Sequence, residues 1–171
     1  MWLNYSNSAS LRLEASTVDL VMFAGYLALV TAALFTGAAF YVSFAEQPAR
    51  LAVDDRALLA EWKPAYKRGF AMQAPLAIIG FLLAVIAWWF TGGVMFVIGG
   101  VLLLANWPWT IFGIMPTNKI LMATEPEEAS PESRAVIVKW NRLHSVRTVL
   151  GCLAMLAFLV ALSTIRLTLV K

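Results

Sequence analysis

Three long stretches without a charged side chain constrain the fold of this chain more than any other feature. They run from Leu20 to Ala45, from Gly69 to Asn118 and from Thr148 to Ile165. A helix of about 20 apolar residues crosses the roughly 30 Å hydrocarbon layer of a bilayer. The middle stretch has 50 residues and therefore holds two such helices. The sequence predicts four transmembrane spans, which are residues 20–45, 69–90, 94–115 and 146–166.

The composition agrees with lipid as the solvent for most of the chain. Of the 171 residues, 61% are hydrophobic and 13% are charged, and the mean hydropathy is +0.76. A soluble domain is about 45–50% apolar and about 25% charged, and a single core of this size cannot bury the excess. In lipid, a helix satisfies its own backbone hydrogen bonds. We therefore predict an all-α fold, a four-transmembrane-helix bundle that forms a single membrane domain over residues 1–171.

Turn and capping residues predict where the spans begin and end. Thr91-Gly92-Gly93 is typical of a turn and separates the second span from the third. Ser16-Thr17-Val18-Asp19 is typical of a helix start, so residues 1–15 are expected to form a loose or surface-lying tail. The first span is too long for the apolar part of a cleaved signal peptide, and no basic segment lies near Met1.

The first long connection, residues 46–68, contains two prolines that suggest a separate helix. Pro48 and Pro64 bracket residues 51–62, which have the pattern of a short amphipathic helix. Because helices tend to end before a proline, we expect this helix to lie on the membrane surface, apart from the spans.

The second long connection, residues 116–145, begins with an acidic loop and ends in a helix. Ser130-Pro131-Glu132 is typical of a helix start, and neither Pro nor Gly follows before Gly151. We therefore expect one helix to run from Pro131 through the fourth span and to extend into the cytoplasm.

The distribution of Lys and Arg predicts the orientation in the membrane. Five of the 13 lie between Ala45 and Gly69 and five between Met115 and Arg147. Positively charged connections stay on the cytoplasmic side. We expect a multi-pass protein of a bacterial inner membrane, with both termini outside and the long connections in the cytoplasm. The basic residues alternate with acidic ones, so no nucleic-acid partner is expected despite a net charge of +3.

Polar residues gather at the cytoplasmic end of the predicted bundle. On the last helix, Trp140, His144, Arg147 and Gly151 fall on one face. The ends of the other three spans bring further polar side chains to the same depth, because the helices of a four-helix bundle pack around one core. These candidate site residues are Glu46, Arg50, Tyr66, Gln73 and Asn118.

Each candidate also has a structural interpretation, and the sequence leaves both open. His144 is the only histidine, and a side chain that titrates near pH 6.5 suits proton transfer, but it equally suits a hydrogen bond between helices. Glu46 and Arg50 have the spacing of a surface ion pair. Gln73 and Asn106 have the character of interhelical hydrogen-bonding residues.

The sequence predicts neither a metal site nor an organic cofactor. One His, a single Cys152 within an apolar run and scattered carboxylates do not form a ligand set. No phosphate-binding loop, dinucleotide fingerprint or serine nucleophile motif is present.

Several stretches together resemble a known family, the anthrone oxygenase-like family of small four-span membrane proteins. The stretches that carry the resemblance are residues 40–50, 66–68, 72–74, 116–119 and 140–147. The resemblance implies oxidation of anthrones to anthraquinones by molecular oxygen, without a metal or flavin. Under it, His144 or Glu46 is the catalytic base, and Arg147, Arg50 or Asn118 stabilises the developing oxyanion.

The same resemblance implies a lipophilic aromatic or quinone-like ligand. Trp140, Tyr66 and Phe70 offer surfaces for a planar ring, and Gln73 lies within reach as a further substrate contact. The competing hypothesis is a non-enzymatic bundle that binds a lipid or quinone or serves as a subunit of a larger membrane complex. Transport is a weaker third hypothesis, because no charged residue lies at mid-membrane.

The oligomeric state is open in the sequence. Small residues at helical spacing allow close helix packing, and Ala28, Ala32 and Thr36 form such a stripe. The stripe fits either the interior of one bundle or a contact with a second copy.

Overall fold

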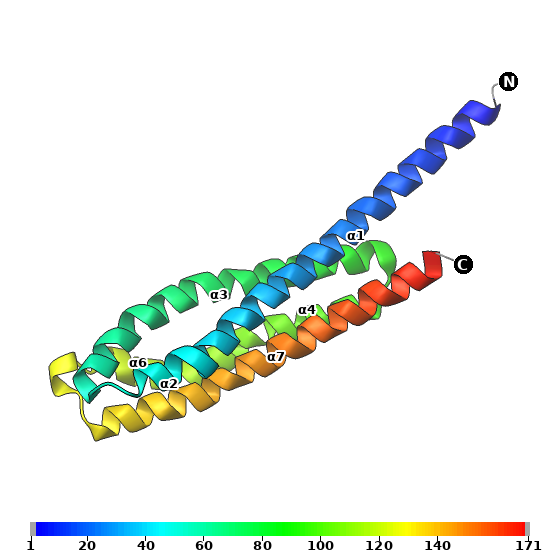
Figure 1. Ribbon diagram of the computed structural model, residues 1–171. Helices are drawn as coiled ribbons and strands as arrows, with labels where there is room; N and C mark the ends of the chain where they lie inside the picture. The colour runs from blue at the N-terminus through cyan, green and yellow to red at the C-terminus, as the bar shows by residue number, and fades with distance from the viewer. Residues whose placement is uncertain (1–2, 170–171) are drawn as a thin grey trace.

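Figure 1 shows a computed structural model of the chain, which describes the backbone of residues 3–169 and the side chains of residues 22–165. Over these residues the fold is all-helical, and four helical rods are long and apolar enough to cross a membrane. The predicted all-α four-helix bundle is therefore confirmed. The rods lie side by side, and the chain reverses direction between successive rods.

The first rod consists of α1 (Leu3–Tyr41), the π-helical segment η1 (Val42–Glu46) and α2 (Gln47–Arg50). The prediction of a loose tail is wrong for residues 3–15, which are helical, while Met1 and Trp2 lie outside the described residues. No Pro or Gly occurs between Leu3 and Ala24, so nothing interrupts a helix that propagates past the capping residues at 16–19. In Figure 1 the first part of α1 projects beyond the other rods.

The second rod is the single helix α3 (Asp55–Thr91), which passes through Pro64 without a break. The prediction of a separate surface helix at residues 51–62 is wrong. Its apolar residues Leu58, Leu59 and Trp62 are fully buried against other rods. Each such burial is worth about 1.5–3 kcal/mol, whereas a proline inside a helix costs about 3 kcal/mol. Burial of the three side chains therefore outweighs the interruption at the proline.

The third rod begins after the predicted turn, which is confirmed. Gly92 ends α3 with a φ of 67°, a left-handed conformation that glycine adopts without steric cost. The rod then consists of α4 (Val94–Leu104), α5 (Asn106–Pro108), the π-helical segment η2 (Trp109–Ile114) and α6 (Met115–Ala123). Pro108 is the last residue of α5 and lies between α4 and η2.

The fourth rod is α7 (Pro131–Leu169), which follows the short 3₁₀ helix η3 (Pro126–Glu128). The predicted helix start at Pro131 is confirmed, and α7 continues without interruption through the apolar stretch. Each rod is longer than the span predicted within it, so residues 46–68 and 116–145 are mostly helical. Their acidic residues Glu125, Glu127 and Glu128 are exposed, as expected of a solvated loop.

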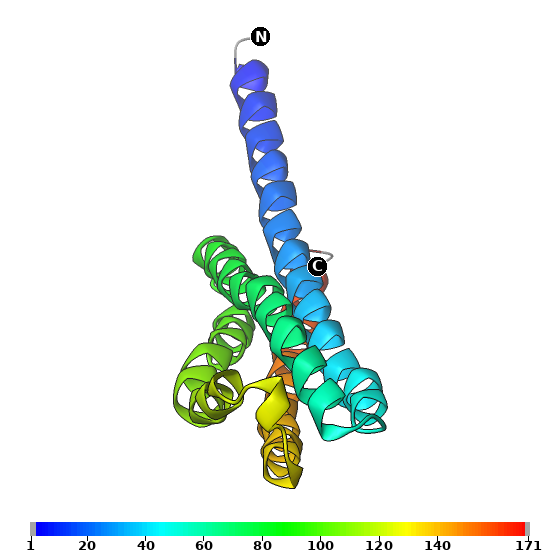
Figure 2. The same cartoon turned by 90° about the vertical axis from the view of Figure 1, so that its left-hand side faces the viewer.

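Small residues allow the rods to approach closely. Helix α1 packs against α3 and α7, and α4 packs against the same two helices (Figure 2). A side chain at Gly151 would collide with Thr36 on α1, so this glycine allows α7 and α1 to approach closely. Ala28 and Ala32 are fully buried and Thr36 is nearly so. The small-residue stripe therefore packs inside the bundle.

The two ends of the bundle differ in character. We call the end formed by the connections 51–54 and 124–130 the loop end. There Leu121, Ile137 and Trp140 form a small core with the first turns of α3. The opposite end carries the Gly92-Gly93 turn and both ends of the described chain (Figure 1).

Candidate functional site

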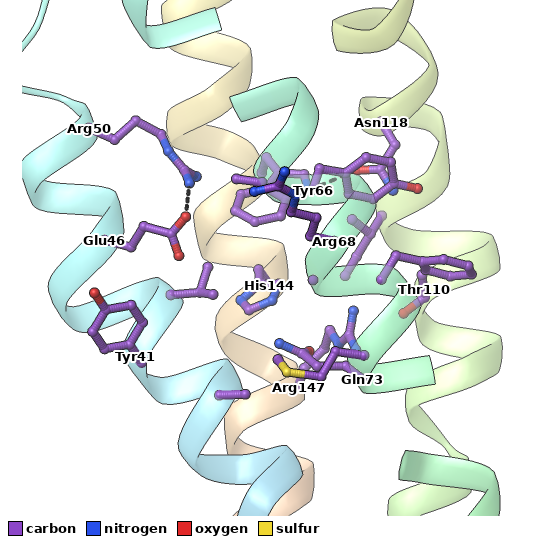
Figure 3. Close-up of a pocket in the computed structure, with 18 residues that line it drawn as sticks. Tyr41, Glu46, Arg50, Tyr66, Arg68, Gln73, Thr110, Asn118, His144 and Arg147 are labelled. Atoms are coloured by element: carbon purple, nitrogen blue, oxygen red, sulfur yellow. Dashed lines mark hydrogen bonds and ion pairs between the residues drawn. The ribbon is translucent and has the colours of Figure 1, made fainter. Parts of the chain in front are cut away.

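A cavity of about 460 Å³ lies among the four rods on the loop-end side; we call it the outer cavity. All eight candidate residues named from the sequence line it, and they come from every rod. They are Glu46, Arg50, Tyr66, Gln73, Asn118, Trp140, His144 and Arg147. Figure 3 shows the labelled members of this set around one space. The structure therefore brings the predicted site residues together, and their chemical roles remain proposals.

Two π-helical segments flank the outer cavity, and prolines explain both. A proline lacks an amide hydrogen and its ring collides with the carbonyl four residues earlier. Pro48 disturbs the helix at Phe44, within η1, and Pro116 disturbs it at Phe112, within η2. Such widened turns change the direction of the side chains and are frequent at functional sites. Here η1 contributes Val42 and Glu46 to the cavity, and η2 contributes Thr110 and Ile114.

His144 is 3% exposed and is held by two contacts. Its Nδ1 lies 3.2 Å from the hydroxyl of Ser43 on η1. Its ring stacks on Trp140, with the centroids 4.8 Å apart. Among the described residues, Nε2 has no hydrogen-bond partner, and His144 lines the outer cavity. One ring nitrogen is thus fixed by protein and the other is available to a ligand.

Arg147 lies one turn after His144 and carries a charge that the described part of the chain does not neutralise. Its side chain forms neither an ion pair nor a hydrogen bond with any described residue, and Nε is fully buried. The guanidinium carbon lies 5.3 Å above the ring of Phe35, a favourable but weak contact for a cation. A buried charge is normally paired, so this guanidinium is suited to an anionic group of a ligand.

Arg50 has the opposite arrangement. It forms ion pairs with Glu46 and Glu61 and donates to Oε1 of Gln47 at 3.2 Å. Figure 3 shows the Arg50–Glu46 pair at the wall of the outer cavity. The spacing of Glu46 and Arg50 is that of an ordinary surface pair, yet Arg50 is only 6% exposed. With two carboxylates beside it, Arg50 is less available to an oxyanion than Arg147.

Two amide side chains in the wall also keep polar atoms without partners. Gln73 is 1% exposed, and neither its amide oxygen nor its nitrogen forms a hydrogen bond. Asn118 accepts a hydrogen bond from Nε1 of Trp140 at 2.8 Å, while its own Nδ2, beside the hydroxyl of Tyr66, completes no well-formed hydrogen bond within the described residues. An unpaired buried polar group costs about 1–3 kcal/mol. These atoms are therefore available to a polar ligand.

The aromatic walls are partly occupied by protein rings. Tyr66 stacks on Trp62 with the centroids 5.1 Å apart and the planes parallel. Trp140 is covered by His144 on one face and meets Trp62 at its edge. Each predicted stacking surface therefore offers a ligand only its remaining face or edge.

The outer cavity opens between α1 and α3. Tyr41 is 61% exposed, Met72 is 50% exposed, and both also line the cavity. Gly69 has open space where a side chain would be. The opening lies within apolar stretches of both helices, so it faces the region that lipid occupies.

Sequence reasoning missed three residues of this region. Glu61 lies in the segment predicted as a separate surface helix. Ser43 lies in residues 40–50, which carry the family resemblance, but no role was predicted for it. Thr110 was not predicted as a site residue. Glu61 and Ser43 reach the site through contacts between rods, with Arg50 and His144, and Thr110 lines the cavity from η2. No local spacing in the sequence signals such contacts. Within the described residues, no group of three His, Cys, Asp or Glu side chains is placed to hold a metal ion.

Comparison with known proteins identifies one family. A family model described as anthrone oxygenase matches residues 62–157, more than half of the chain. The matched segment contains six of the eight candidate residues, and Glu46 and Arg50 precede it. No curated protein and no solved structure matches the chain.

Proposed function

The chain belongs to the anthrone oxygenase family, and on this premise we propose that it oxidises a lipophilic polycyclic phenol or quinol with molecular oxygen in the outer cavity. One observation carries the proposal. His144 and Arg147 lie one turn apart, both are buried, and each presents a group without a protein partner to the same cavity. A base beside an unpaired cation suits a reaction that creates an organic anion.

His144 is the better candidate for the base. The carboxylate of Glu46 is engaged by Arg50, whereas His144 lines the cavity and its Nε2 has no hydrogen-bond partner among the described residues. His144 would remove a proton from an acidic C–H group or phenol, and Arg147 would hold the resulting oxyanion. A positioned base contributes about 10²–10⁴ in rate, and one oxyanion donor about 10²–10³.

The overall reaction balances without a further reductant. An anthrone-type CH₂ group loses both hydrogens, one oxygen atom of O₂ becomes the new carbonyl oxygen, and the other leaves in water. The aromatic anion supplies the electrons. The protein is required to deprotonate the substrate, hold the anion and admit oxygen.

The size and opening of the outer cavity suit a planar apolar substrate. Small-molecule sites commonly enclose about 300–1,000 Å³, and this cavity has about 460 Å³. The opening beside Tyr41 and Met72 faces the lipid region, where such a substrate would dissolve. Entry from the bilayer follows from both properties.

We also propose that the loop end is cytoplasmic, with both termini outside, in a bacterial inner membrane. The excess of Lys and Arg in residues 46–68 and 116–147 supports this orientation. Reporter fusions at the C-terminus and within residues 124–130 test it. A reporter active in the cytoplasm at the C-terminus contradicts it.

The second candidate function is non-enzymatic binding of a lipid or quinone, either alone or as a subunit of a larger complex. Arg68 favours it, because this exposed cation lines the same cavity that opens towards lipid and suits an anionic headgroup. Native mass spectrometry distinguishes the two: this candidate predicts a retained lipid or partner and no turnover.

The decisive experiment supplies an anthrone under air to the purified protein in lipid nanodiscs and follows quinone absorbance. His144→Ala and Arg147→Ala should each lose the activity, while Arg142→Ala should retain it. Arg142 is an exposed arginine on the same helix that does not line the outer cavity. Oxidation no faster than the spontaneous background refutes the enzymatic proposal for this substrate. Equal rates in all variants refute the assigned residues.

A further inference from the structure

A second cavity of about 80 Å³ lies further from the loop end than the outer cavity; we call it the inner chamber. Its walls come from α1, α3 and α7 and from the broken middle of the third rod. The two spaces share the side chains of Phe70, Gln73, Thr110 and Arg147. Figure 3 shows Gln73, Thr110 and Arg147 in the wall of the outer cavity. The inner chamber therefore adjoins the proposed reaction site, with these side chains between the two spaces.

Three polar side chains in its walls keep atoms without a partner in the part of the chain whose side chains are described. Oδ1 of Asn106, both amide atoms of Gln73 and Nε of Arg147 are buried there without a hydrogen bond. All three residues are more than nine-tenths buried. Asn106 turns its Nδ2 back onto the carbonyl of Leu103 at 3.0 Å, which leaves only its oxygen unpaired. The two donors among them, Nε2 of Gln73 and Nε of Arg147, suit an occupant that accepts hydrogen bonds, as reduced dioxygen does and neutral dioxygen does not.

Apart from Thr110, the rest of the wall is apolar. Phe35, Phe70, Ala77 and Trp107 contribute hydrocarbon or aromatic surface. A single water takes about 30 Å³ in the liquid, so the chamber holds an occupant of only a few heavy atoms. The substrate rings do not fit. Apolar walls favour an occupant that is neutral when it enters. The cation at the boundary, Arg147, favours an occupant that becomes negatively charged during the reaction.

We propose, on the basis of the function proposed above, that the inner chamber binds dioxygen and that Arg147 and Gln73 stabilise its reduced form. The substrate anion in the outer cavity transfers one electron to dioxygen, which gives an organic radical and superoxide. The two combine through a new C–O bond into a peroxide anion, which takes back the proton from His144. Loss of the remaining C–H hydrogen with the terminal OH, as water, forms the carbonyl. Arg147 borders both spaces, so one cation serves the substrate oxyanion and then the peroxide.

The kinetic test fills the chamber from its buried wall. Ala77→Val adds two methyl groups where Ala77 lines the inner chamber but not the outer cavity. The KM for dioxygen, measured in a closed cell at varied oxygen, should rise at least fivefold while the KM for anthrone stays unchanged. The control is Ala161→Val, a buried alanine on α7 that lines neither space, and its kinetics should match the wild type. An unchanged KM for dioxygen in Ala77→Val overturns the proposal.

A second variant that fills the inner chamber keeps the proposal testable if Ala77→Val does not fold. Ile111→Phe enlarges a side chain that lines the chamber and is also 45% exposed, so the extra atoms have room to settle. It should raise the KM for dioxygen in the same direction. If both variants fold and neither changes this constant, the chamber is not the oxygen site.

Xenon gives a reading that does not depend on catalysis. Wild-type crystals pressurised with xenon, an apolar probe of gas-sized cavities, should show one atom in the inner chamber, and Ala77→Val crystals should not. A chamber filled with ordered water and free of xenon overturns the proposal. Xenon binding in a protein that does not oxidise anthrone refutes the proposed enzymatic function while it supports a gas-sized site. The two failures are thereby distinguished.

Discussion

The hydroxyl of Ser43 and Nδ1 of His144 lie 3.2 Å apart, although 101 residues separate them in the chain. The contact joins η1 to α7 and orients the imidazole in the outer cavity. Neutral imidazole carries its proton on one ring nitrogen only. For Nε2 to act as the base, Nδ1 must carry the proton and donate a hydrogen bond to the hydroxyl oxygen of Ser43. The proposed mechanism therefore requires the serine oxygen to be the acceptor.

Replacement of Ser43 by alanine tests this orientation. We expect kcat to fall about tenfold with an unchanged KM for anthrone. The free energy of unfolding should change by only about 0.5–1.5 kcal/mol, since a single hydrogen bond is lost. Ser145→Ala is the control, because that hydroxyl donates only to the carbonyl of Asn141 on its own helix. A wild-type kcat in Ser43→Ala would show that the contact does not orient the base.

Replacement of Arg147 by leucine should separate activity from stability. The buried guanidinium has no carboxylate partner among the described residues, so its removal relieves the penalty of an unpaired charge. We expect kcat to fall about 10²–10³-fold while the melting temperature stays the same or rises. Parallel loss of activity and thermal stability would assign Arg147 a structural role. Arg147→Lys, which keeps the charge, should retain part of the rate.

The ion pair between Arg50 and Glu61 should matter more to stability than a neighbouring exposed pair. Arg50 has only 3% of its side chain exposed, whereas Arg56 and Glu127 have 69% and 65% exposed. Because Glu61 is itself half-exposed, we expect Glu61→Gln to cost about 1–2 kcal/mol. Glu127→Gln should cost less than about 1 kcal/mol. Thermal unfolding of both variants in the same detergent gives the comparison, and equal shifts would argue against a stabilising role of the buried pair.

A large side chain at Gly69 should obstruct entry from the bilayer. This glycine lines the outer cavity and has open space around it, so Gly69→Phe introduces no clash with the backbone. We expect the KM for anthrone to rise severalfold with little change in kcat. Ala71→Phe is the control, since Ala71 is exposed on the same helix and lines neither cavity. Unchanged kinetics in Gly69→Phe would place the entrance elsewhere.

Two glycine substitutions should test the packing between α4 and α7. A methyl group at Gly99 would collide with the ring of Phe158, and overpacking of this kind costs about 1–3 kcal/mol. At Gly37 the same methyl group meets nothing within 4 Å. We therefore expect Gly99→Ala to lower the melting temperature and Gly37→Ala to leave it nearly unchanged. Equal melting temperatures would show that the rods shift apart at little cost.

The resemblance to a family came from the sequence, in residues 40–50, 66–68, 72–74, 116–119 and 140–147, and the match over residues 62–157 supports it. The candidate residues could be predicted because each lies near the end of an apolar stretch. Because the four helices pack with these ends together, the candidate residues come to line one cavity. What each residue contacts could not be predicted in this way. Arg50 and Arg147 look alike in sequence. In the structure, however, Arg50 forms ion pairs with two carboxylates, whereas Arg147 forms none among the described residues.

By itself, the sequence determined the four apolar helices, the turn at Gly92 and the helix start at Pro131, because the length of an apolar run and the conformational preferences of Gly and Pro are local properties. Only the tertiary structure decided that α3 passes through Pro64, that Glu61 joins Arg50, and that an inner chamber adjoins the outer cavity. Each of these depends on how one helix is rotated against another. That rotation is fixed by the packing of side chains from distant parts of the chain, which no local pattern records.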